Sequence, residues 1–71
     1  MMPKEKKDPL PANLQNARRE VGLRQVDVMI RLELSSPSVV SGWEQGVHTP
    51  SIEMLRRLAE LYGTTVGELI G

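Results

Sequence analysis

Residues 41–46 read Ser-Gly-Trp-Glu-Gln-Gly, and residues 49–51 follow as Thr-Pro-Ser. The aromatic and acidic pair followed by glycine is typical of a short helix that ends at Gly46. Proline directly after Thr49 predicts that the next helix opens at Pro50, because Thr caps a helix and Pro suits its first turn. The centre of the chain is therefore predicted to hold two short helices joined by a tight connection.

Working outward, apolar residues recur at helical spacing on both sides of this centre. Leu10, Leu14, Ala17 and Val21 mark the first helix, and the pattern Thr65-x-x-Glu68 is a capping box that opens the last. The predicted helices span 11–21, 24–33, 36–45, 50–62 and the residues after Thr65. In the fourth, the stripe expected to be buried is Ile52, Leu55, Leu58, Ala59 and Tyr62. The predicted fold class is all-α.

The composition excludes several classes of protein. The 71 residues suit one small domain, and without Cys there is no disulfide or thiolate metal site. A single His predicts no metal centre, and no cofactor, small-molecule site or enzymatic constellation is evident. No apolar run approaches a membrane span or a signal peptide, so we expect a cytoplasmic protein associated with the nucleoid. The formal net charge of zero counts against strong non-specific binding of nucleic acid.

Three sequence blocks together resemble a known family. Gly22-Leu23-Arg24-Gln25, Trp43-Glu44-Gln45-Gly46 and Pro50-Ser51 follow the pattern of the Xre/Cro/phage-repressor (Cro/C1-type) family, over roughly residues 14–70. The resemblance implies a compact, five-helix, lambda-repressor-like domain at 10–71, with a helix-turn-helix formed by its second and third helices. It implies a transcriptional regulator, of repressor type, that binds double-stranded operator DNA as a homodimer. Helix 3, at about 36–45, would lie in the major groove.

Residues 1–9 precede this domain, and we interpret them as a flexible basic arm. Lys4, Lys6 and Lys7 could extend along DNA, although an ordinary frayed terminus explains the same composition.

The resemblance also implies which residues meet DNA. Gln25, at the start of helix 2, would donate to a phosphate, with Arg24 and Gln45 as further phosphate candidates. His48, in the loop after helix 3, is a further candidate for DNA contact, although a solvated loop histidine is the simpler interpretation. Arg18 and Glu44 are predicted to form a structural ion pair, with one side of Arg18 open to a phosphate. The positions of helix 3 expected to face the groove are Ser36, Pro37, Ser38, Val39, Ser41 and Gly42.

The chain departs from the family pattern in places. The interval from Gln25 to Glu44 is one residue longer than the common spacing, which predicts a longer turn near Ser35-Ser36. Met29 replaces the usual Ala and Glu33 the usual Gly, so an altered crossing of helices 2 and 3 is expected. The groove-facing positions lack Arg, Lys, Asn and Gln, the side chains that read guanine or adenine bidentately. Gly42, unfavourable inside a helix, suggests close approach to DNA or to helix 1.

A second function class stays open. The same fold also serves as a protein-interaction module, as in antitoxins and coactivators, and a fold does not fix a function. Zero net charge and the apolar residues Val26 and Ile30 on the outer face of helix 2 favour it, whereas Gln25 and the basic arm favour DNA.

Overall fold

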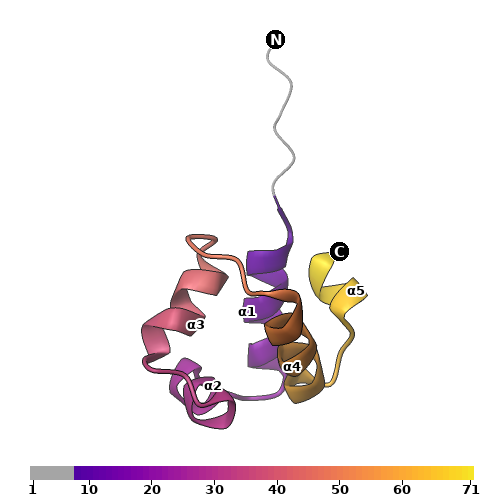
Figure 1. Cartoon of the computed structure of the whole chain (residues 1–71). Helices are drawn as coiled ribbons and strands as arrows, with labels where there is room; N and C mark the ends of the chain where they lie inside the picture. The colour runs from indigo at the N-terminus through magenta and orange to yellow at the C-terminus, as the bar shows by residue number, and fades with distance from the viewer. Residues whose placement is uncertain (1–7) are drawn as a thin grey trace.

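The computed structural model describes residues 8–71, so the prediction for Lys4, Lys6 and Lys7 lies outside the described residues. The described part contains five helices and no strand (Figure 1). Their bounds are α1 Leu10–Glu20, α2 Gln25–Leu32, α3 Pro37–Glu44, α4 Ile52–Tyr62 and α5 Val66–Ile70. The predicted all-α class is confirmed.

Helix α1 holds the fold together. Figure 1 shows α2 and α3 on one side of it and α4 and α5 on the other, and α1 contacts α3, α4 and α5 directly. Leu14, Val28, Val40, Leu58 and Leu69 each expose 1% or less of their surface, one from each helix. One shared core thus fixes how α2 and α3 stand relative to the rest.

Helices α1 to α4 end with the same pair of backbone hydrogen bonds, and α2 alone has a residue other than glycine in the left-handed position. At the end of α2, Leu34 N–H donates to the Met29 carbonyl at 2.9 Å and Glu33 N–H to the Ile30 carbonyl at 3.3 Å. This pair of bonds needs a left-handed residue, and Glu33 adopts it with φ of 56°. The ends of α1, α3 and α4 use the same bonds with glycine in that position. Glu33 is therefore strained where its counterparts are not.

The start of α4 corrects the prediction for Thr49-Pro50. The helix begins at Ile52, and Ser51 is its cap, accepting a hydrogen bond from Met54 N–H at 3.1 Å. Pro50 lies buried before the helix. Ile52 was expected in the core but, as the first residue of α4, is 60% exposed.

The remaining boundaries differ by a residue or two. Helix α1 ends at Glu20, which leaves Val21 exposed instead of completing the apolar stripe. Helix α3 is shorter than 36–45, because Ser36 and Gln45 cap its ends. The capping box predicted for α5 is present, with Thr65 Oγ1 accepting from Glu68 N–H at 3.0 Å.

Candidate nucleic-acid interface

A buried ion pair connects α1 to the end of α3. Arg18 Nε donates to Glu44 Oε2 at 2.6 Å and Arg18 Nη2 donates to Glu44 Oε1 at 2.9 Å. Arg18 Nη1 donates to the Leu23 carbonyl at 2.8 Å, so the guanidinium also fixes the turn before α2. The structure brings together the two residues predicted to pair. Arg18 is only 8% exposed, which leaves no open side for the phosphate contact that was expected of it.

The charges of this pair are mutually stabilised. The hydrogen bonds that the Arg18 guanidinium donates to Glu44 raise the pKa of Arg18, against the opposing effect of burial. Tyr62 lies close enough to feel both charges, and burial raises the pKa of its hydroxyl above the ordinary range. A doubly bonded, buried pair of this kind fixes orientation more surely than it adds stability.

Gln25 joins the ion pair from the first position of α2. Its Nε2 donates to Glu44 Oε1 at 3.1 Å. Glu44 thereby holds residues from α1 and α2 at the end of α3. One of the two Nε2 protons is used, and the other remains for an outside acceptor. The structure thus places the predicted phosphate donor beside α3, and its contact with phosphate stays a prediction.

Arg24, just before α2, has a partner that the sequence reasoning missed. Its guanidinium donates to both carboxylate oxygens of Asp27 at 3.0 Å, and Asp27 accepts from Arg24 N–H at 2.7 Å. These bonds from Arg24 lower the pKa of Asp27 to about 2. The spacing of three residues was the available signal, since it matches that of a capping box. The Arg24 side chain is still 77% exposed and can meet a phosphate from this position.

One face of α3 points away from the core and carries short side chains. Val40, Trp43 and Glu44 are buried on the inner face. Ser38 and Gly42 lie four residues apart on the opposite face, with Gln45 beside them. Ser36 is the predicted cap: its Oγ accepts from Ser38 N–H at 3.2 Å. Pro37 and Ser38 are exposed and Ser36 is half-buried.

The groove candidate Val39 and the phosphate candidate Gln45 are less free than expected. Val39 is half-buried and packs against the core, so only part of it is open to a thymine methyl group. Gln45 is exposed, but its Nε2 donates to Ser41 Oγ at 2.9 Å, one turn earlier. Residues four apart on a helix are neighbours, so this bond was readable from the spacing.

Gly42 has a different reason for lacking a side chain than either of the two predicted. A Cβ atom added there would lie 3.0 Å from Cδ2 of the His48 imidazole. The nearest obstacle is therefore the loop after α3, and neither α1 nor the space outside the protein. His48 itself is exposed.

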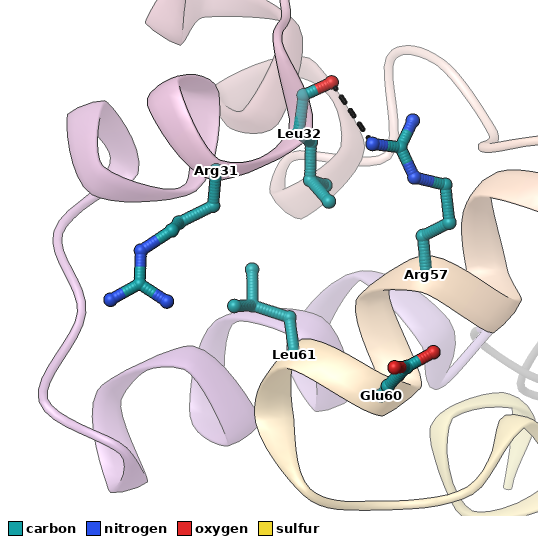
Figure 2. A pocket seen from close by; sticks show the side chains of 5 residues that line it. All are labelled: Arg31, Leu32, Arg57, Glu60 and Leu61. Atoms are coloured by element: carbon teal, nitrogen blue, oxygen red, sulfur yellow. Dashed lines mark hydrogen bonds between the residues drawn. The ribbon is translucent and has the colours of Figure 1, made fainter.

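A surface cavity of about 270 Å³ lies apart from these residues, between α2 and α4 (Figure 2). It is lined by Arg31, Leu32, Arg57, Glu60 and Leu61. Arg57 Nη2 donates to the Leu32 carbonyl at 3.4 Å, which satisfies an open carbonyl at the end of α2. Arg57 thus has a structural role.

Comparison with known proteins identifies the family. The family described as "Helix-turn-helix domain" matches residues 10–70. The chain belongs to the helix-turn-helix domain family. This match confirms the helix-turn-helix fold that the resemblance at Gly22, Trp43 and Pro50 implied. Within residues 8–71, no helix is long and apolar enough to cross a membrane.

Several proteins resemble this helix-turn-helix domain. The HTH-type transcriptional regulator DdrOP3 of Deinococcus deserti is 40% identical over 57 residues, which are 80% of this chain and 43% of that protein. The crystal structure of the DNA-binding domain of BldD matches with a TM-score of 0.77 and 30% identity, covering 99% of this chain and 100% of that one. Apo-HppE matches with a TM-score of 0.79 and 25% identity, covering 90% of this chain and 35% of that one. The chain thus spans less than half the length of DdrOP3 and about a third of HppE.

Proposed function

We propose that this domain is the DNA-binding part of a transcriptional regulator. The observation that carries the proposal is the bond from Gln25 to Glu44, which ties the start of α2 to the end of α3. A helix-turn-helix binds DNA by laying its first helix across the backbone and its second in the major groove. Here Gln25 and Arg24 occupy the backbone position, and the outward face of α3 occupies the groove position. The names of DdrOP3 and of the BldD domain support the same function.

The distribution of charged residues along the chain favours binding to DNA through a few phosphate contacts. All three lysines lie in residues 1–7, and residues 8–71 carry six Arg against eight Asp plus Glu. Attraction to phosphate must therefore come from particular residues, such as Arg24 and the lysines of the arm. Replacing Lys4, Lys6 and Lys7 with Ala should flatten the salt dependence of binding, because each lost phosphate contact lowers the slope.

We further propose that the domain acts as a repressor and binds a pseudo-palindrome as a homodimer. A single module of this size covers little DNA, and pairing doubles the contact area. Tyr62 and Leu69 are buried in the core and cannot form a dimer surface. Ile70 remains 46% exposed at the end of α5, with Val66 half-buried beside it. Half-sites are expected about 34 Å apart, one helical turn of DNA.

Fluorescence anisotropy with a generic DNA duplex across a salt series tests the proposal. The parent should bind at low salt with steep salt dependence, and Gln25→Ala should bind several-fold more weakly through loss of a phosphate hydrogen bond. Asn16→Ala is the matched control, because it removes a carboxamide from the opposite side, near α5. Absence of binding at low salt would overturn the DNA function.

One observation favours the second candidate, a protein-interaction module. Ile30 is 63% exposed on α2, whereas Val26, the other residue expected there, is half-buried. If DNA binding fails, Ile30 is the residue on which to seek a protein partner. Ile30→Lys should leave DNA affinity unchanged or slightly raised if the DNA function holds.

A further inference from the structure

We propose that His48 reads a base, and that its imidazole takes the place of the missing side chain of residue 42 on the outward face of α3. The proposal rests on the proposed DNA-binding function and adds a specificity residue to it. In this arrangement Gly42 is a positioning residue, because its lack of a side chain gives the imidazole its seat.

The position of Gly42 on the helix is the first step. Residues 38, 42 and 45 lie opposite the buried residues Val40, Trp43 and Glu44. A side chain at position 42 would therefore project from the middle of the face that enters the groove. Gly42 is nevertheless only half-exposed, although a glycine on an outward helix face should be open.

The chain reversal after α3 explains what covers Gly42. Gly46 has φ of 76°, and Val47 N–H donates to the Gly42 carbonyl at 2.9 Å. His48 N–H donates to the same carbonyl at 3.3 Å. Two backbone bonds thus hold His48 against the last turn of α3. Its ring carbon Cδ2 lies 3.0 Å from where a Cβ of residue 42 would be.

The chemistry of the imidazole supplies what α3 lacks. The exposed positions of α3 offer serine hydroxyls and no guanidinium or ammonium group. A ring N–H is a directed donor, and the other ring nitrogen can accept or donate according to protonation. Guanine presents two adjacent acceptors, N7 and O6, in the major groove. His48 is therefore matched to a guanine near the centre of the α3 contact.

In this proposal Gly42 and His48 act as one unit, so the effect of a change at Gly42 should depend on the presence of His48. A methyl group at position 42 would meet the ring at a distance tighter than ordinary contact, so Gly42→Ala must displace the imidazole. Because His48 is exposed, the ring can move outward without unfolding the domain. Gly42→Ala should thus act on base preference through His48, and have no effect on that preference when His48 is absent.

The experiment is selection of bound duplexes from a randomised DNA library by the full 71-residue chain. The variants are Gly42→Ala, His48→Ala and the double variant, with Arg24→Ala as the phosphate-contact control. His48→Ala should lose the preference for one G·C pair per half-site, with about a tenfold loss in discrimination there. Gly42→Ala should weaken the same preference, and the double variant should match His48→Ala at that position. Arg24→Ala should lower affinity without changing the selected sequence.

Two results for the variants would overturn the inference. One is a His48→Ala profile that keeps every base preference, whether affinity is unchanged or uniformly lower, since His48 would then be a phosphate contact or a bystander. The other is a double variant that loses a further preference beyond His48→Ala at the same position. Salt-dependent binding by the parent without any sequence selection also refutes base reading, yet it retains the proposed function. No binding at all refutes both. Circular dichroism melts confirm that each variant is folded.

Discussion

The two sides of α3 are built on opposite principles. On the inner side, Glu44 accepts hydrogen bonds from Arg18 and Gln25, and in residues 8–71 no buried polar side-chain atom lacks a partner. On the outer side, Ser38 and Gly42 present almost no side chain. Contacts on the inner side fix the position of α3, and the short side chains on the outer side leave space for a binding partner. The difference shows that the position of the α3 backbone is fixed by contacts on its inner side, and that the outer side contributes few long side chains of its own.

The same contrast separates two kinds of ion pair. Arg18 and Glu44 expose 9% and 2% of their side chains, whereas Arg24 and Asp27 expose 77% and 27%. Water screens the exposed pair, so it organises a helix start with little effect on stability. Water does not solvate the buried pair, so the loss of either partner leaves an unpaired charge in the core and lowers the free energy of unfolding strongly.

Breaking the inner side should give the largest effect. Glu44→Ala leaves the Arg18 guanidinium buried without its anion, and we expect a loss of about 3 kcal/mol in the free energy of unfolding. Chemical denaturation measures it. The double variant Arg18→Met and Glu44→Leu should be more stable than Glu44→Ala. A double variant no better than Glu44→Ala would show that the pair matters for more than the unpaired charge.

Removing the cap at the start of α3 should have an intermediate effect on the free energy of unfolding. Ser36→Ala removes the oxygen that accepts from Ser38 N–H at the start of α3, at a cost of about 1 kcal/mol. Thermal unfolding followed by circular dichroism checks this value. Ser35→Ala is the matched control, because Ser35 is exposed and does not cap the helix. Equal losses in the two variants would contradict the capping role of Ser36.

Relieving the backbone strain at Glu33, at the end of α2, should raise the free energy of unfolding slightly. Glu33 holds a left-handed conformation that costs a non-glycine residue about 1 kcal/mol or more. Glu33→Gly removes this strain but loosens the unfolded chain, so a net gain of about 0.5 kcal/mol is expected. Glu33→Ala keeps the strain and should show no gain in the same denaturation measurement. A stabilised Glu33→Ala would point to the charge of Glu33 as the cause.

The exposed pair should respond to pH with the smallest effect. The pKa of Asp27 is about 2 when folded against an ordinary value of 3.8. A lowered folded pKa stabilises above the ordinary value, so this contribution is complete above pH 4 and disappears as pH falls through 2. Carboxyl chemical shifts in an NMR titration report the value. In Arg24→Ala the pKa should return toward the ordinary value, and an unchanged pKa would exclude Arg24 as the cause.

Local signals predicted most of the fold correctly. Proline after Ser36 and the Thr65 capping box marked two helix starts, because caps act within a few residues. Where two caps competed, at Thr49 and Ser51, the sequence alone favoured the wrong one. Pro50, expected in the helix, instead lies buried before it, and burial depends on residues far along the chain.

The candidate site was less predictable, because its contacts join distant residues. The roles of Arg18, Glu44 and Gln25 came from a family resemblance, and the bond between Gln25 and Glu44 appears only when α2 and α3 are packed together. The seat of His48 on Gly42 was unforeseen, since a glycine in a helix has several possible reasons. The role of each of these residues toward DNA stays a prediction.

The sequence by itself determined the five helices and nearly all of the core, because helical periodicity, caps and breaks are local properties. Its helix-turn-helix family followed from the resemblance of three motifs to known proteins. Only the tertiary structure decided that Glu44 holds Gln25 and that His48 lies where the side chain of residue 42 is absent. These contacts join residues that only packing brings within reach, and local propensity carries no information about them.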